Sequence, residues 1–105
     1  MAKYEMLVGL EVLDDVVYSQ YRTAMRPILE EKGGEFGYDF RVSEVLKSEV
    51  TECINRVFTL RFPSKSIMTS FFDDPRYQAV KSEYFSPSVG SFTIIRGYDV
   101  DECHF

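Results

Sequence analysis

The stretch VFTLRFPSKSIMTSFFDDPRYQAVKSEY, residues 57–84, carries the clearest structural signals of the chain. Its first six residues are rich in β-branched and aromatic side chains and predict a β-strand. Ser64 can cap a helix over about residues 65–73, because its hydroxyl can accept an exposed backbone N–H group. The Asp-Pro pair at 74–75 starts a second short helix, since proline is well tolerated at the first helical position. The stretch therefore predicts a strand, a helix and a further short helix.

Three more strands are predicted on either side of this stretch, over residues 4–13, 35–49 and 91–98. The first is almost continuously apolar, which is typical of a central strand. Its Gly9 has no side chain to pack, and such a position often marks close approach by another group. Two sets of residues alternate along the second: Phe36, Tyr38, Phe40 and Val42 on one face, and Gly37, Asp39, Arg41 and Ser43 on the other. Residues 48–55 are polar and are predicted to form a hairpin turn.

A long helix is predicted between the first two strands. Asp14 or Asp15 can cap its start, and the glycine pair at 33–34 can end it. Its apolar stripe consists of residues at helical spacing: Val17, Tyr21, Ala24, Met25 and Ile28. Charged residues lie largely outside this stripe: Arg22, Arg26, Glu30 and Glu31.

The predicted element order, β-α-β-β-α-β, defines the fold class. It is the split βαβ or ferredoxin-like motif, an α+β fold in which two helices cover one face of an antiparallel sheet. We expect a single domain over residues 4–98 and a frayed C-terminal tail over 99–105. The sheet face opposite the helices would be bare and carries many apolar residues. We therefore expect a homodimer that joins two chains through this open sheet face.

The charge balance and the cysteines restrict the class of protein. The 105 residues include 12 basic and 17 acidic side chains, a net charge of −5, and no basic run, so nucleic-acid binding is not expected. No apolar run is long enough to span a membrane, and no signal peptide is recognised. Cys53 and Cys103 are isolated, which favours reduced thiols over a disulfide. We expect a cytoplasmic protein.

Metal and cofactor sites have no support in the sequence. His104 is the only histidine, and its neighbour Cys103 does not supply the three or four converging ligands that a metal needs. The lack of a second histidine also argues against a catalytic triad or a histidine-dependent proton relay. The glycines match neither a dinucleotide-binding nor a P-loop pattern. We expect no metal and no cofactor.

Five segments resemble domain-of-unknown-function family 1330 (DUF1330) of the dimeric α/β barrel superfamily: LEVLDDVVYSQYR (10–22), KGGEF (32–36), LRFPS (60–64), DDPRYQAV (73–80) and IIRGY (94–98). The most specific feature is the Phe-Pro-Ser break followed by an Asp-Pro-x-Tyr restart. The resemblance covers about residues 4–98 and implies dimerisation sheet face to sheet face. Three residues stand where the family often has a basic side chain: Glu35, Asp39 and Tyr84. An anionic ligand held by those positions in relatives is therefore not implied here, although Arg41 or Arg61 could substitute.

The candidate site residues are tyrosines and charged side chains. The resemblance implies that Tyr21 and Tyr77 direct their hydroxyls into a pocket between helices and sheet, whereas their apolar surroundings fit simple core packing. The charged candidates on predicted strands are Glu11, Asp39, Arg41 and Arg61. Taking the first and third strands as parallel neighbours, we expect a Glu11–Arg61 pair, either in a ligand site or as a structural ion pair.

Two functional hypotheses follow. The first is a non-catalytic homodimer that binds a small molecule, favoured because no catalytic constellation is visible. The second is a cofactor-independent enzyme, similar to the monooxygenases and isomerases of the superfamily. In that case Tyr21, Tyr77, Tyr84 and an arginine, Arg41 or Arg61, would position the substrate. The base would be Glu11 or Asp39. This second hypothesis rests on analogy of fold.

Overall fold

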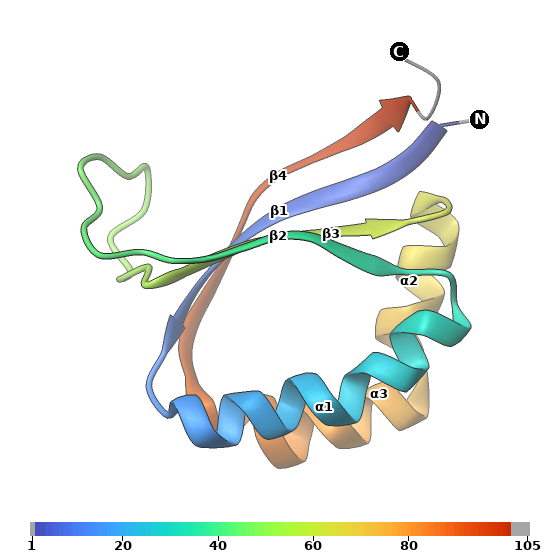
Figure 1. Ribbon diagram of the computed structural model, residues 1–105, viewed down its shortest axis with the longest axis horizontal. Helices are drawn as coiled ribbons and strands as arrows, with labels where there is room; N and C mark the ends of the chain where they lie inside the picture. The colour runs from blue at the N-terminus through green and yellow to red at the C-terminus, as the bar shows by residue number, and fades with distance from the viewer. Residues whose placement is uncertain (1, 102–105) are drawn as a thin grey trace.

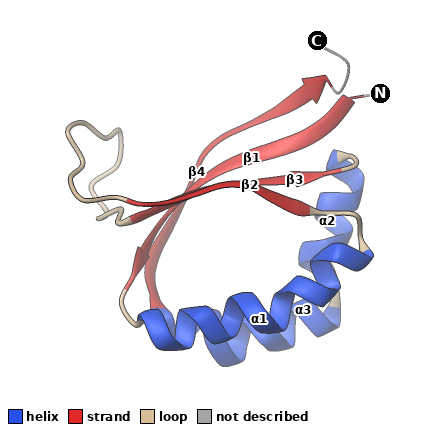
Figure 2. Cartoon of the chain, in the orientation of Figure 1, coloured by secondary structure: helices blue, strands red, loops and turns tan. Residues whose placement is uncertain are grey.

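The computed structural model of the protein describes residues 2–101, which form one antiparallel sheet and a layer of helices (Figure 1). In chain order the elements are β1 (Ala2–Val12), α1 (Asp15–Glu31), β2 (Glu35–Arg41), β3 (Arg56–Phe62), α2 (Lys65–Asp73), α3 (Pro75–Val80), the π-helical turn η1 (Lys81–Phe85), α4 (Ser86–Ser88) and β4 (Val89–Asp101). The strand order is β2-β3-β1-β4, and every neighbouring pair is antiparallel. The helices lie on one side of the sheet (Figure 2), which confirms the predicted ferredoxin-like α+β fold.

The helix boundaries agree closely with their sequence signals. Asp14 rather than Asp15 caps α1, and its carboxylate accepts two backbone N–H groups of the first turn at 3.1 Å. Gly33, with φ of 78°, provides the left-handed residue just after the helix. Ser64 caps α2 and Asp74 caps α3, as predicted. Within the described part of the chain, no helix is long and apolar enough to cross a membrane.

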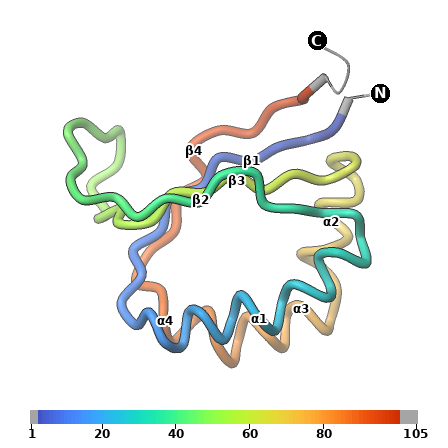
Figure 3. The backbone as a smooth tube through the Cα atoms, viewed as in Figure 1, coloured from blue at the N-terminus to red at the C-terminus, as the bar shows by residue number. Residues whose placement is uncertain are grey.

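The connection after β2 differs most from the prediction. β2 ends at Arg41, so the strand predicted over 35–49 is wrong beyond that residue. Residues 42–55 form a long loop that projects from one end of the sheet (Figure 3). Its ends are joined by a bond from the Val42 N–H to the Asn55 carbonyl, 2.9 Å long. The Asn55 side chain also bonds the N–H and the carbonyl of the last residue of β1, at 2.7 and 3.0 Å, which fixes the base of the loop.

Because β2 contains a β-bulge, the predicted alternation of its side chains between the two sheet faces is wrong. Between Phe36 and Asp39 the ladder with β3 gains one residue, and the Thr59 hydroxyl accepts the Tyr38 N–H at 2.8 Å. The extra residue reverses the phase of the strand. Phe36 packs against the helix side of the sheet, whereas Tyr38 and Phe40 are exposed, so these rings do not share one face.

The direction of β3 overturns one predicted contact. β1 and β3 are neighbours, but they are antiparallel rather than parallel, because the hairpin after β2 reverses the chain. Glu11 and Arg61 consequently lie toward opposite ends of the strand pair, and the expected Glu11–Arg61 pair is wrong. Arg61 instead bonds Glu5, directly opposite it in the ladder, at 2.9 Å. Tyr98 of β4 donates to the same carboxylate at 2.6 Å.

The last strand extends further than predicted. β4 continues to Asp101, so the first three residues of the expected tail over 99–105 belong to the sheet. The lengthening follows from pairing with the start of β1, which begins at Ala2. Cys103 and His104 lie outside the described residues.

β4 is an edge strand with a bulge of its own. Leu7 of β1 faces Arg96, and the next residue, Val8, faces Ile94. Ile95 is therefore the additional residue in the ladder. Such a bulge bends the strand and increases its local twist.

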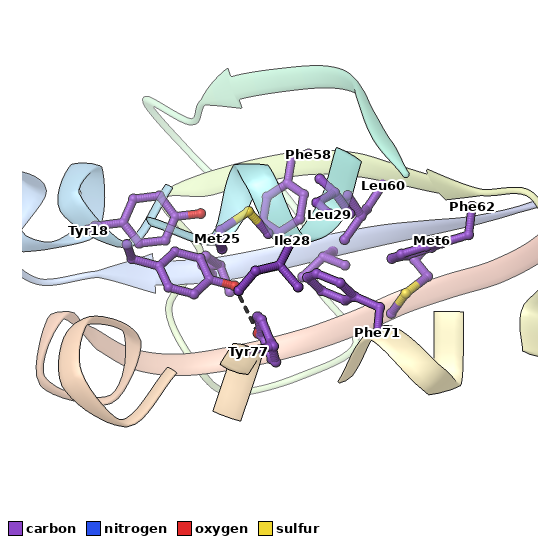
Figure 4. Close-up of a cluster of buried hydrophobic side chains, with 13 residues drawn as sticks. Met6, Tyr18, Met25, Ile28, Leu29, Phe58, Leu60, Phe62, Phe71 and Tyr77 are labelled. Carbon is purple, nitrogen blue, oxygen red and sulfur yellow. Dashed lines mark hydrogen bonds between the residues drawn. The ribbon is translucent and has the colours of Figure 1, made fainter. Parts of the chain in front are cut away.

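The hydrophobic core lies between the helix layer and the sheet (Figure 4). Alternate residues of β1 and β3 face the helices: Met6, Val8, Leu10, Phe58, Leu60 and Phe62. Helix α1 contributes Tyr18, Tyr21, Met25, Ile28 and Leu29, and the following helices contribute Phe71 and Tyr77. The core thus uses one face of the sheet only.

Gly9 of β1 allows the close contact that its lack of a side chain predicts. The Ile54 side chain, at the end of the 42–55 loop, comes within 3.0 Å of the position that a Cβ atom at residue 9 would occupy. We expect Gly9→Val to destabilise the protein by about 1–3 kcal/mol, because the added methyl groups overpack this contact.

Urea unfolding of Gly9→Val, Ile54→Ala and the double variant measures this effect. The double variant should lose less stability than the sum of the two single variants, because the smaller residue 54 leaves room for valine. Strict additivity would show that Ile54 does not restrict position 9.

Candidate ligand-binding pocket

A cavity of about 270 Å³ lies between the helix layer and the sheet, where the family resemblance placed a pocket. Its walls are mainly apolar and include the strand residues Met6, Val8, Leu10, Phe58 and Leu60 and the helix residues Met25, Met68, Phe72 and Phe85. Phe92 and Ile94 of β4 also line it and are 56% and 53% exposed, so they form its rim. The strand alternation that builds the core therefore also builds one wall of the cavity.

Two of the residues that line this cavity are tyrosines whose hydroxyls bond each other. The Oη atoms of Tyr21 and Tyr77 are 2.9 Å apart and share a hydrogen bond, the dashed line that ends at Tyr77 in Figure 4. Tyr21 comes from the buried row of α1, and Tyr77 from the first turn of α3, which the Asp74 cap positions. The bond joins the two helices across the helix layer.

Both tyrosines remain protonated at neutral pH. Burial raises the pKa of Tyr21 far above its ordinary value, and the neighbouring Tyr77 adds to the effect. Burial raises the pKa of Tyr77 as well. The pair therefore acts as a source of hydrogen-bond donors and does not supply a base.

Arg22 is a lining residue that the sequence analysis left outside the site. Its guanidinium lies over the ring of Phe36, 4.0 Å from the centroid, and over that of Phe58 at 4.8 Å. Its Nε donates to the Tyr18 hydroxyl at 2.8 Å. The helical spacing could have placed Arg22 beside the buried residues, because it is four residues after Tyr18 and three before Met25, both in the buried row of α1.

Asp39 is the ion-pair partner of Arg22. Nη1 of Arg22 donates to the Asp39 carboxylate at 3.2 Å, while Nε and Nη2 of Arg56 donate to it at 2.8 and 2.9 Å. The hydrogen bonds from Arg56, together with the charges of both arginines, hold the pKa of Asp39 below its ordinary value. Asp39 is thus an ionised structural partner and is not among the residues that line the cavity.

Lys81 is a second cationic lining residue. It begins η1, where the Ser86 N–H bonds the Lys81 carbonyl five residues earlier and closes a π-helical turn. This turn is wider than an α-helical one, and such turns are frequent at functional sites. Lys81 and Phe85, at the two ends of η1, both line the cavity.

The structure brings only two of the seven predicted site residues to the cavity, Tyr21 and Tyr77. Five are not among its lining residues: Glu11, Asp39, Arg41, Arg61 and Tyr84. Arg41 forms an exposed ion pair with Asp15 at 3.7 Å. Tyr84 packs against the core, and the neighbouring Glu83 carboxylate raises the pKa of its hydroxyl. Among residues 2–101 no group of three or more His, Cys, Asp or Glu side chains could hold a metal ion.

An antiparallel sheet covered on one face by helices, with an apolar cavity between the layers, defines a ferredoxin-like α+β protein with an internal pocket. Sequence comparison then identifies the particular family. The chain belongs to the family described as domain of unknown function DUF1330, whose model matches residues 4–98. This confirms the resemblance noted from the five segments. No curated protein matches the sequence.

Solved structures share the fold. A protein of unknown function from Rhodopseudomonas palustris, RPA0582, superposes with a TM-score of 0.75 at 17% identity, covering 94% of this chain and 81% of that one. The hydroxynitrile lyase of Passiflora edulis gives 0.66 at 13% identity, with 95% and 94% covered. A dimeric ferredoxin-like protein of unknown function from Thermobifida fusca gives 0.56 at 9% identity, with 94% and 90% covered. At these identities the likeness concerns the fold alone.

The shared bond of the two tyrosines leads to a test by substitution. We expect Tyr21→Phe and Tyr77→Phe each to lower the free energy of unfolding by about 0.5–1.5 kcal/mol, since each removes the same hydrogen bond. The double variant should be about as stable as either single variant. Urea unfolding measures these values, and Tyr84→Phe is the control outside the cavity. Additive losses would contradict a shared bond.

Proposed function

We propose that the chain, as a single domain over residues 4–98, forms a cytoplasmic homodimer that binds a small, largely apolar molecule in the cavity between helices and sheet. The observation that carries this proposal is the cavity itself, which encloses a hydroxyl pair within apolar walls. Empty apolar volume lowers stability, so a 105-residue chain gains by filling it with a ligand.

The size and lining of the cavity support small-molecule binding. Its volume of about 270 Å³ is close to the lower end of known ligand pockets. The three described methionines, Met6, Met25 and Met68, all line it. Because methionine is unbranched and flexible, such a wall can adapt to the shape of a ligand.

Catalysis in the same cavity is the second candidate. The specific observation in its favour is the hydroxyl pair, together with the enzymatic activity named for the Passiflora edulis protein of the same fold. We prefer binding because the lining residues include no carboxylate and no imidazole, and because both tyrosines stay protonated. The cavity therefore offers hydrogen bonds and positive charge to a ligand, without an evident base.

The open sheet face supports the proposed dimer. Tyr38 and Phe40 are 65% and 55% exposed and stack on one another with ring centroids 5.7 Å apart. Glu5, although charged, is only 8% exposed, and Arg61 and Tyr98 bond it. Its charge is thus already compensated, so a partner can cover this face at a small desolvation cost. The Thermobifida fusca protein of the same fold is described as dimeric.

The 42–55 loop gives the same face a concave edge. A hollow of about 830 Å³ lies between this loop and the sheet, and Leu46, Val57 and Ile95 help line it. Leu46 is 89% exposed. Burial of such a side chain in a second chain would remove a large apolar area from water.

The proposed cytoplasmic location is supported by Cys53, an exposed free thiol, which suits a reducing compartment.

Native mass spectrometry of gently purified protein tests the dimer. We expect two subunits for the wild type and mainly monomers for Phe40→Asp, because the new carboxylate would be buried against the partner. Val16→Asp is the matched control, since Val16 is 71% exposed on the start of α1, in the helix layer. A monomeric wild type, or equal dissociation of both variants, would contradict dimerisation through the open face.

Methyl NMR on protein labelled at its methionines tests the pocket. Indole, a small neutral aromatic probe, should shift the methyl signals of Met6, Met25 and Met68 in a saturable manner. Ile94→Trp should weaken this binding at least tenfold by narrowing the rim, whereas Leu46→Trp, outside the cavity, should not. Unchanged methyl signals at millimolar indole would contradict a ligand pocket.

A further inference from the structure

The charge of the cavity lining differs from the charge of the whole molecule. The chain has a net charge of −5, yet the lining contains two cationic side chains, Arg22 and Lys81, and no carboxylate among the described residues. If charged residues were placed at random in an acidic protein, carboxylates would outnumber cationic side chains in the lining. Positive charge is therefore concentrated at the apolar cavity between the two layers.

Only part of the charge of Arg22 is neutralised. Its carboxylate partner, Asp39, is shared with Arg56, which makes the shorter contacts of 2.8 and 2.9 Å, against 3.2 and 3.5 Å from Arg22. Two guanidinium groups thus share one carboxylate, and the cluster keeps one net positive charge. Arg22 is the more weakly held of the two and is the one that lines the cavity.

The lining also has spare hydrogen-bond donors. Of the five N–H groups of the Arg22 guanidinium, one bonds Tyr18 and two face Asp39, which leaves two. The Tyr21–Tyr77 bond uses one of two hydroxyl protons, which leaves another. Lys81 forms no ion pair with any side chain that the structure describes, those of residues 3–100. A ligand that satisfies these groups must present acceptor oxygens.

From these observations we infer that the pocket selects a small organic acid, with a slim apolar body and a carboxylate that Arg22 and Lys81 recognise. The inference rests on the proposed function of the cavity as a binding site. A ligand carboxylate can accept a bond from one remaining guanidinium N–H group of Arg22 and another from the ammonium group of Lys81, and such charge-assisted bonds are stronger than neutral ones. The apolar walls exclude water and reduce the screening of these charges. The tyrosine hydroxyl with the spare proton can donate to a carboxylate oxygen or to a second oxygen on the ligand.

Arg22 would act as a specificity-determining residue whose position depends on its neighbours. The rings of Phe36 and Phe58 pack against the guanidinium, and the Asp39 carboxylate forms an ion pair with it. A side chain held in this way loses little conformational freedom when it binds a ligand. Lysine at position 22 would retain the charge without the planar arrangement of donors.

Three probes with the same phenyl body and different heads test the inference: 3-phenylpropanoate, 3-phenylpropanamide and 3-phenylpropylamine. Binding is followed by the methionine methyl signals. We expect the acid to bind at least tenfold more tightly than the amide, and the amine to bind more weakly than the amide. Raising the salt concentration should narrow the difference between acid and amide only partly, because the Arg22 side chain is only 11% exposed and buried charges are screened less.

Charge-removing variants assign the preference to residues. Arg22→Gln and Lys81→Gln should each reduce the acid-to-amide ratio several-fold while indole binding persists. Arg26→Gln, on the exposed side of α1, and Lys65→Gln, on α2, remove the same charge away from the lining and should leave the ratio unchanged. Lys81 is partly exposed, so its variant remains informative if Arg22→Gln fails to fold.

Two results would overturn the inference. Equal affinity for acid and amide, with normal indole binding, would remove the acid preference and leave the pocket intact. A preference for the acid over the amide that persists in both Arg22→Gln and Lys81→Gln would show that other groups recognise the carboxylate of the probe. Failure of all three probes and of indole would instead contradict the pocket itself, and with it the proposed function.

Discussion

Alternation of side chains along β1 and β3 is the constraint on which the other features depend. One row, which includes Val8 and Leu60, faces the helices and forms both the core and a wall of the cavity. The opposite row carries Glu5 and Arg61, which pair with each other because the Glu5 carboxylate is buried and a buried charge needs a partner. The Thr59 bulge then changes the phase of β2, so that Asp39 reaches the helix side and can hold Arg22. A local irregularity in β2 thus determines where a cation meets the pocket.

The sequence predicts the parts of this protein whose causes are local. Asp14, Ser64 and Asp74 cap helices with their own side chains, and Gly33 adopts a conformation that few other residues tolerate, so each can be recognised within a few residues. Tyr21 and Tyr77 were recognised through the family resemblance, and the structure joins them by a bond.

The remaining errors have tertiary causes. The bulge in β2 depends on a hydroxyl from another strand, and the length of the 42–55 loop depends on the amide of Asn55 bonding β1. The expected Glu11–Arg61 contact is wrong because it takes β1 and β3 as parallel, whereas these neighbours are antiparallel in this motif. Arg22 is absent from the predicted site because it lies outside the apolar stripe of its helix, although an arginine can lie flat on aromatic rings.

The bulge at Ile95 affects how copies of this protein can meet. β4 lies at the edge of the sheet and runs from Val89 to Asp101, so its outer side presents a long row of backbone groups without a neighbouring strand. A straight edge of that length is a template for adding further strands, the first step toward fibrous aggregates. The extra residue breaks the regular spacing and twists the strand partway along its length. Open-ended growth from strand to strand is thereby discouraged, while the broad face of the sheet stays accessible for a closed pairing of two chains.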